Sequence, residues 1–215
     1  MHIVIHIIIW SIVAALVWIF VIAKIARKIY PFPIPQIMVN LIDNRFRRKY
    51  IQNPDEIAQR MGAKPGDIVI ELGPGKGFYS IGVAKRIEPD GKLYAIDIEQ
   101  KILDRLQIRL NQKNITNIIP KKDNAHNLDF EDESVDLIFA VACLPEIPEP
   151  IEVLKEFKRI LKPEGRISLC ELFIDPDYPL RSTVRKWTVA AGLEVKEEFG
   201  SWFTYQLNIG KPAEK

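Results

Sequence analysis

The chain has 215 residues, a formal net charge of +2 and only two cysteines, Cys143 and Cys170. A chain of this length holds one α/β domain of ordinary size plus an appendage. Its near-neutral charge provides no general attraction for nucleic acid, and cysteines in apolar stretches indicate reduced thiols rather than a disulfide framework. The three histidines and two cysteines match no zinc spacing, and no carboxylate cluster has ligand spacing, so we expect no metal site.

The first element is a long apolar run from Ile3 to Ala23, interrupted by His6 and Ser11. It holds about 21 residues and would be roughly 31 Å long as a helix, enough to cross a hydrocarbon core of about 30 Å. A cleaved signal peptide is the alternative, but no basic region precedes the run and no clean cleavage site follows it. We therefore predict a transmembrane anchor over residues 1–28.

Cations follow the apolar run directly, at Lys24, Arg27 and Lys28, whereas only His2 and the amino terminus precede it. Positively charged flanks face the cytoplasm in most membrane proteins. We therefore expect a single-pass membrane protein whose catalytic domain is cytoplasmic.

Residues 29–52 are predicted to form a linker and a basic amphipathic juxtamembrane segment. Prolines 31, 33 and 35 exclude a regular helix and favour an extended linker at the membrane surface. Apolar residues at helical spacing come next, followed by the cations Arg45, Arg47, Arg48 and Lys49. A solvated helix end is the alternative, but beside a membrane span we favour contact with anionic lipid headgroups over nucleic-acid binding.

Residues 53–215 are predicted to form one α/β domain. Asn53 and Pro54 are typical of a helix start, and Gly62 is typical of the end of the helix over 55–61. The next element is a buried strand at 68–71, which runs straight into a turn containing Gly73, Gly75 and Gly77. A helix over 79–87 follows this turn, so its free N–H groups are expected to face any ligand held there.

The glycine spacing excludes two common nucleotide-binding motifs. A dinucleotide fingerprint needs a third glycine where Phe78 stands, which disfavours a dehydrogenase. A phosphate-binding P-loop needs serine or threonine after its lysine, but Gly77 follows Lys76. The motif that remains is E-x-G-x-G-x-G, which on its own is compatible with a simple strand-to-helix turn.

Asp97 closes a second predicted strand, over 93–97. A carboxylate at this position is suited to accept hydrogen bonds from both hydroxyls of a ribose. The alternative is an N-cap for the following helix, and the glycine turn makes us favour ribose binding.

Asn124 and Ala125 follow a short third strand, where a polar side chain and a backbone N–H can meet the edge of an adenine. Strands are expected at 117–120, 134–142, 166–173, 193–199 and 202–209, and helices at 99–113, 152–161 and 180–191. Five strand–helix units and a closing antiparallel pair predict a doubly wound sheet with its ligand at the carboxyl ends of the strands.

Taken together, the segments VIELGPGKG, YAID, DNAHNLDFEDESVDLIF, LPEIPEPIEVLKEFKRILKPEGR and WFTYQLNI resemble the class I S-adenosylmethionine-dependent methyltransferases, in particular the ubiquinone- and menaquinone-type branch. The resemblance extends from Pro54 to Lys211. It implies a Rossmann-like seven-stranded α/β fold, following the N-terminal transmembrane helix, and S-adenosyl-L-methionine as cofactor.

The resemblance also assigns residues to parts of the cofactor. It implies that the methionine moiety is held by the turn of Glu71, Gly73, Gly75 and Gly77, the ribose by Asp97, the adenine by Ile98, Asn124 and Ala125, and that Ala140 and Cys143 lie near the reactive methyl group. Glu146 and Tyr79 border the expected acceptor side, but no residue is assigned a catalytic role.

A membrane anchor predicts an acceptor that resides in the bilayer. We therefore expect methylation of a lipophilic small molecule, a phospholipid headgroup amine or a quinone precursor. Two alternatives stay open: a membrane-tethered protein methyltransferase, and a non-enzymatic module that binds S-adenosylmethionine.

Overall fold

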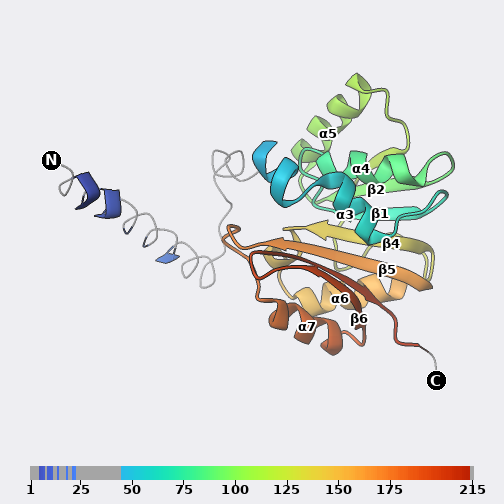
Figure 1. The fold of residues 1–215 in the computed structure, drawn as a ribbon. Coiled ribbons are helices and arrows are strands. Elements are labelled where there is room, and N and C mark those ends of the chain that lie inside the picture. Colours follow the sequence, from blue (N-terminus) through green and yellow to red (C-terminus); the bar gives the residue numbers. More distant parts are fainter. Residues whose placement is uncertain are drawn as a thin grey trace.

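The computed structural model describes residues 45–213, together with 5–7, 9–11, 14, 18 and 21–22. Its centre is a seven-stranded sheet in the order β3-β2-β1-β4-β5-β7-β6 (Figure 1). The strands are β1 (Ile68–Leu72), β2 (Lys92–Asp97), β3 (Ile118–Lys122), β4 (Val135–Val141), β5 (Leu161–Leu172), β6 (Glu194–Gly200) and β7 (Thr204–Gly210). The predicted doubly wound, Rossmann-like sheet is confirmed.

Helices cover both faces of the sheet (Figure 1). One face carries α3 (Pro54–Met61), α4 (Phe78–Ile87) and α5 (Gln100–Gln112), and the other carries α6 (Pro150–Ile160) and α7 (Arg181–Ala190). Two short turns, η1 (Arg47–Ile51) and η2 (Leu144–Glu146), complete the named elements. The sheet is therefore the middle layer of three.

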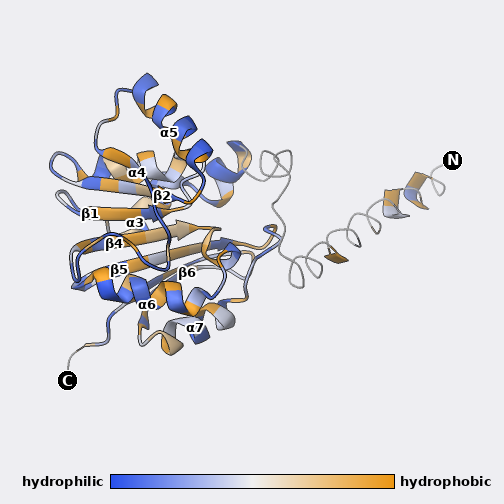
Figure 2. Ribbon diagram, turned by 180° about the vertical axis from the view of Figure 1, so that it is seen from behind, coloured by the Kyte–Doolittle hydropathy of each residue, from blue (hydrophilic) through white to orange (hydrophobic). Residues whose placement is uncertain are grey.

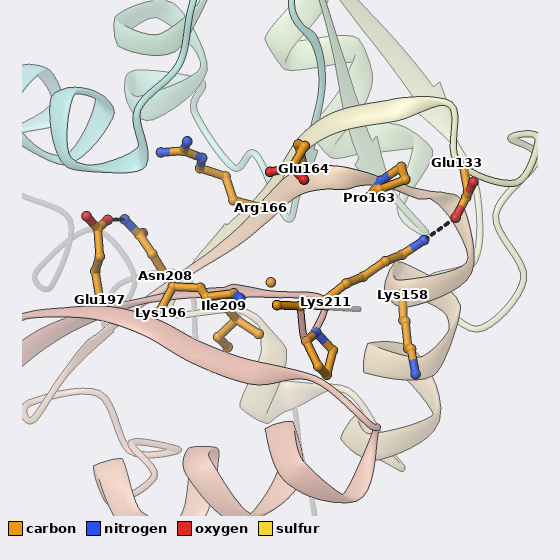
Figure 3. Close-up of a pocket in the computed structure, with 14 residues that line it drawn as sticks. Glu133, Lys158, Pro163, Glu164, Arg166, Lys196, Glu197, Asn208, Ile209 and Lys211 are labelled. Atoms are coloured by element: carbon orange, nitrogen blue, oxygen red, sulfur yellow. Dashed lines mark hydrogen bonds and ion pairs between the residues drawn. The ribbon is translucent and has the colours of Figure 1, made fainter. Parts of the chain in front are cut away.

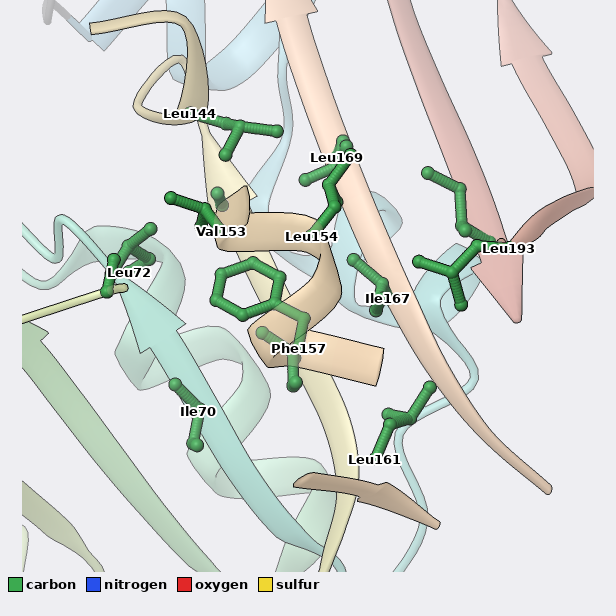
Figure 4. Close-up of a cluster of buried hydrophobic side chains, with 14 of the residues drawn as sticks. Ile70, Leu72, Leu144, Val153, Leu154, Phe157, Leu161, Ile167, Leu169 and Leu193 are labelled. Carbon is green, nitrogen blue, oxygen red and sulfur yellow. The ribbon is translucent and has the colours of Figure 1, made fainter. Parts of the chain in front are cut away.

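Each face of the sheet has its own apolar core. The α6 side chains Val153, Leu154 and Phe157 lie over Ile70 of β1 and its neighbours, all of them completely buried (Figure 4). Hydropathy follows the same layering, with apolar residues along the central strands and polar ones on the outer helix faces (Figure 2).

The first five strands run parallel, and β7 pairs antiparallel with β5. Backbone hydrogen bonds join neighbouring strand ends: Gly73 N–H donates to the Ile96 oxygen (2.9 Å) and Phe173 N–H to the Phe203 oxygen (2.7 Å). Because parallel strands put their carboxyl ends at one edge, the loops after β1, β2, β3, β4 and β5 meet there. We call this the cofactor edge.

Local signals at the start of the domain are confirmed. The Asn53 side chain accepts the N–H groups of Asp55 and Glu56 at the start of α3, and Gly62 ends that helix with φ of 69°. The fifth strand differs, because the predicted turn at 162–165 lies within β5. Leu161 pairs with Val135 and Arg166 pairs with Leu137, so the residues between them form a bulge.

The predicted transmembrane anchor falls mostly outside the described residues. Those described between 5 and 22 are helical, and Trp10 and Trp18 among them are each 68 % exposed. Within the described parts of the chain, no helix combines the length and apolarity that crossing a bilayer requires. The anchor stays a prediction, and so does the proline linker at 30–35, which lies outside the described residues.

The basic segment behaves differently from the expectation at Arg47. Its side chain is buried, and its Nε donates to Gln52 Oε1 at 2.8 Å, while Gln52 itself bonds to the Glu171 oxygen of β5. Arg47 therefore faces the domain and is not available to lipid headgroups, whereas Arg45 and Lys49 are exposed. Sequence pattern missed this because a cation in a basic run gives no sign of a buried partner.

Candidate cofactor and acceptor site

The glycine turn after β1 needs backbone conformations that favour glycine. Gly73, Gly75 and Gly77 have φ of 67°, 51° and 70°, all in the left-handed region. A Cβ at Gly73 would lie 2.4 Å from the Cys143 sulfur, whereas a Cβ at Gly75 would meet nothing within 4 Å. Gly73 is therefore required for close packing, and Gly75 borders open space that a ligand can enter.

Glu71 lies at the carboxyl end of β1 and is 2 % exposed. Burial raises the pKa of its carboxyl group to about 8, and the nearby Ser80 hydroxyl partly offsets the rise. Its Oε2 atom has no hydrogen-bond partner. Buried polar atoms are normally paired, so an unpaired carboxylate oxygen beside a glycine turn points to a cationic or hydrogen-donating ligand group.

Asp97 lies at the end of β2, beside the glycine turn. Its Oδ1 accepts the Glu99 N–H at 2.9 Å, which forms a turn just before α5. The N-cap of that helix is Glu99, so the N-cap interpretation is wrong for Asp97. Burial is also the main reason that its pKa is raised. The adjacent Ile98 is 68 % exposed, which leaves an apolar side chain at the rim where the resemblance places adenine.

The adenine-edge residues lie in a tight loop after β3. Ala125 is buried, whereas Asn124 is exposed. The Asn124 Oδ1 accepts the His126 N–H at 3.1 Å, and His126 Nε2 is 2.9 Å from the Pro148 oxygen. An adenine amino group would therefore have to share the Asn124 Oδ1 with the His126 N–H, so the predicted contact is more crowded than the sequence implied.

Ala140 and Cys143 approach the same edge from β4. Ala140 is fully buried and pairs with Leu72 in the neighbouring strand. Burial, followed by the charge of Glu146 and then of Asp97, raises the pKa of the Cys143 thiol far above its usual value, so it is a neutral packing group. The structure thus brings the predicted residues from β1, β2, β3 and β4 to one edge; that they bind a cofactor stays a prediction.

Phe78, which excluded the dinucleotide fingerprint, stacks under two cations. The Arg48 guanidinium carbon lies 3.5 Å from the ring centroid and that of Arg109 lies 3.9 Å from it. Arg109 also donates to the Lys76 oxygen inside the glycine turn. These contacts connect η1 and α5 to the turn. Unlike the glycine turn itself, they follow no motif that can be recognised in the sequence.

Carboxylates gather on the other side of the cofactor edge. Glu146, Asp175 and Asp177 each offer an oxygen, and the three atoms lie within 4.8 Å of one another. Ligand spacing along the sequence did not reveal this group, and the expectation of no metal site stays a prediction. Glu146 follows β4 and the two aspartates follow β5, so only the fold brings them together.

An aromatic cluster surrounds this region and consists of Phe173, Tyr178, Trp202, Phe203 and Tyr205. The Phe173 ring is 5.6 Å from Tyr178 and 5.4 Å from Trp202, centroid to centroid. Trp202 is 72 % exposed. The loop after β5 and the hairpin before β7 therefore present aromatic surface at the edge.

A surface cavity of about 1020 Å³ lies elsewhere, at the start of β5 and the end of β7 (Figure 3). The residues that line it are largely charged, and two of them, Lys211 and Glu133, form an ion pair. Parallel α/β sheets bind ligands at the carboxyl ends of their strands, so this cavity is not the expected cofactor site.

The residues at the cofactor edge fit S-adenosylmethionine. The unpaired Glu71 oxygen suits an ammonium group, the open side of Gly75 admits the chain of the methionine, and Asp97 with Ile98 suits a ribose and its base. The strand order and this edge define the class I methyltransferase fold.

Comparison with known proteins agrees with that class. A family model described as a methyltransferase domain matches residues 63–206. The chain belongs to this methyltransferase family, and S-adenosylmethionine is the cofactor that family and fold imply.

One relative is a demethylmenaquinone methyltransferase of Lactobacillus johnsonii, 31 % identical over 139 residues that cover 62 % of this chain and 54 % of the relative. The chain spans about half the length of the demethylmenaquinone methyltransferases it matches. The substrates of these relatives therefore do not establish the substrate of this chain.

Solved structures share the fold. A methyltransferase from Aquifex aeolicus superposes with a TM-score of 0.74 at 22 % identity, over 82 % of this chain and 98 % of that one. The [4+2]-cyclase SpnF superposes with a TM-score of 0.68 at 17 % identity, over 80 % of this chain and 86 % of that one. Because a cyclase shares it, the fold alone does not decide the reaction.

Proposed function

We propose that the protein transfers a methyl group from S-adenosylmethionine to a lipophilic acceptor, a quinone precursor or a phospholipid headgroup amine. The observation that carries the proposal is the arrangement of the cofactor edge. The glycine turn with the unpaired Glu71 oxygen lies on one side of Cys143, and the aromatic and carboxylate groups lie on the other.

For this reaction the protein mainly has to position the acceptor and the cofactor relative to each other. S-adenosylmethionine supplies a methyl group that is already electrophilic. The chain must hold an acceptor in line behind that group and exclude water, an effect that can supply several kcal/mol. Cys143 packs against Gly73 and would separate the cofactor side from the acceptor side.

Two features support a lipophilic acceptor. Trp202 is exposed and packs against the half-buried Phe203, which offers apolar surface beside the site. The apolar amino-terminal sequence, with its exposed Trp10 and Trp18, supports a single-pass anchor that would hold this edge near the bilayer. We propose a cytoplasmic orientation for the domain on the same grounds, and names of relatives add weight to the quinone class.

The test is transfer of a radiolabelled methyl group from S-adenosylmethionine to the native membrane fraction, followed by organic extraction. We expect label in the organic phase, and we expect Asp97→Ala to abolish it. Label that stays with precipitated protein would favour a tethered protein methyltransferase. Cofactor binding without any transfer would leave a non-enzymatic binding module.

The anchor has a separate test. Deleting residues 1–30 should lower transfer to lipid vesicles while leaving cofactor affinity unchanged, because every predicted cofactor residue lies between Glu71 and Ala140. Unchanged transfer to vesicles would remove the argument for a bilayer-resident acceptor.

A further inference from the structure

The carboxylates on the acceptor side are held together by the loops that carry them. The Asp175 N–H donates to the Leu172 oxygen at 2.9 Å, which turns the chain back toward the end of β5. The Asp177 N–H then donates to Asp175 Oδ1 at 3.0 Å. From the neighbouring strand, the Glu146 N–H donates to the Cys143 oxygen at 3.1 Å. Backbone hydrogen bonds thus fix three like charges close together.

A fourth carboxylate lies beneath them. Glu171 is 1 % exposed, and its Oε2 has no hydrogen-bond partner. After burial, the charges of Asp175 and Glu146 are the largest influences that raise its pKa, so its carboxyl group lies close to theirs. Buried polar atoms are normally paired, so an unpaired oxygen beside three further carboxylates points to a ligand that supplies positive charge.

We propose that Glu146, Asp175 and Asp177 bind one hard divalent cation of the Mg²⁺, Mn²⁺ or Ca²⁺ type, with Glu171 supporting the site from below. The three oxygens lie within 4.8 Å of one another. Ligand distances of about 2.1 Å for Mg²⁺ and about 2.4 Å for Ca²⁺ place opposite oxygens about 4.2 to 4.8 Å apart. Ligands that are all oxygen favour these cations over zinc or copper.

The nearby groups favour this class of ligand. The charge of Arg47 acts on Glu171 in the opposite direction, but it is a weaker influence than the charges of Asp175 and Glu146. The Cys143 sulfur packs at Gly73, on the cofactor side of the cluster. The burial runs from Glu171 and Asp175 at the bottom to an exposed Glu146, which leaves a route for an ion from solvent.

The role of the ion rests on the proposed function, although its binding does not. An ion at this place lies on the acceptor side of Cys143, so an acceptor oxygen can complete its coordination. A headgroup phosphate and a quinone oxygen share that chemistry. The ion would then position the acceptor behind the methyl group and stabilise negative charge on the bound oxygen.

The experiment is Tb³⁺ luminescence on the full chain in detergent, excited through the nearby aromatic rings. Tyr178 belongs to the same turn, because its N–H donates to the Asp175 oxygen at 3.1 Å. We expect saturable binding of one Tb³⁺ per chain, reversed by Ca²⁺ or Mn²⁺. The double variant Asp175→Asn with Asp177→Asn should lose saturable binding, and Glu171→Gln should weaken it by about tenfold or more.

Asp90→Asn is the matched control, because Asp90 is exposed and lies away from the cofactor edge. It should bind Tb³⁺ like the unaltered protein. Circular dichroism checks folding of the double variant, and Glu146→Gln, at an exposed position, repeats the test without altering buried groups. Absence of saturable binding, or equal binding by all variants, would overturn the proposal.

Methyl transfer separates this proposal from the proposed function. Transfer that continues in a chelator, with no Tb³⁺ site, would overturn the cation site and keep the function. Saturable Tb³⁺ binding without transfer to any extractable acceptor would keep the site and overturn the function.

Discussion

The two halves of the cofactor edge each contain a buried carboxyl group with an unpaired oxygen, Glu71 in β1 and Glu171 in β5, but their surroundings differ. Glu71 adjoins a turn whose shape comes from the backbone of three glycines. Glu171 lies among side chains that come from separate loops. The first half is therefore predicted to hold a cofactor whose shape is constant, and the second to hold a ligand that depends on its side chains.

The largest expected effect tests the Glu71 side through pH. Its pKa is raised from 4.5 to about 8 by burial. A raised carboxyl pKa means that the folded state binds the proton more tightly, so its contribution is present below pH 4.5 and is lost as pH rises toward 8. The cofactor-free protein should therefore lose up to roughly 4 kcal/mol of unfolding free energy over that range.

Glu71→Gln should remove most of that loss, as chemical denaturation at several pH values would measure. Glu164→Gln is the control at an exposed carboxylate and should leave the slope unchanged. Binding of S-adenosylmethionine should release a proton between pH 5 and 8, detectable by calorimetry in buffers of different ionisation enthalpy. An unchanged slope in Glu71→Gln would show that Glu71 is not the group responsible.

The second prediction concerns the backbone of the turn. Gly73→Ala combines a strained left-handed φ with a clash against the Cys143 sulfur, so it should cost about 3 kcal/mol of unfolding free energy. Gly75→Ala has the same kind of φ but open space, so it should cost only about 1 kcal/mol. Urea unfolding measures both, and equal losses would contradict the packing argument. Gly75→Ala should instead weaken cofactor binding.

These contrasts explain what the sequence could reveal. The cofactor half comes from short contiguous motifs, so the succession of strands and helices, the glycine turn and the position of Asp97 at a strand end were predictable. The acceptor half joins Glu146 to Asp175 and Gln52 to Glu171, pairs that depend on tertiary packing. The bulge in β5 was missed because its Lys-Pro-Glu-Gly stretch has the composition of a helix-ending turn.

The third prediction concerns Asp97, which has both a structural and a predicted ribose contact. Asp97→Asn keeps an acceptor for the Glu99 N–H, so unfolding free energy should change by less than about 1 kcal/mol. It removes the charge that strengthens hydrogen bonds from a ribose, so cofactor affinity should fall about tenfold to hundredfold by calorimetry. Asp104→Asn on α5 should change neither quantity. A loss of stability without a loss of affinity would leave Asp97 only its structural contact with the Glu99 N–H.

The smallest expected effect lies at Arg109, which supports the glycine turn from outside. Its guanidinium lies over Phe78 and donates to the Lys76 oxygen, so it restrains the turn without reaching the Gly75 side, where the ligand enters. Arg109→Ala should lower cofactor affinity only a few-fold, in line with about 1 kcal/mol for a partly exposed cation–π contact. Arg105→Ala on the same helix is exposed and should have no effect.

The Arg109→Ala substitution should lower affinity for the cofactor alone. Tb³⁺ affinity on the acceptor side should be unchanged in Arg109→Ala, because α5 packs at the β2 and β3 end of the sheet, away from β5. If the affinities for cofactor and for Tb³⁺ both fell, the two halves of the cofactor edge would be structurally coupled. The contrast between a half shaped by backbone and a half shaped by side chains would then be wrong. If only the cofactor affinity falls, Phe78 acts in this chain as a ring by which neighbouring cations hold the turn.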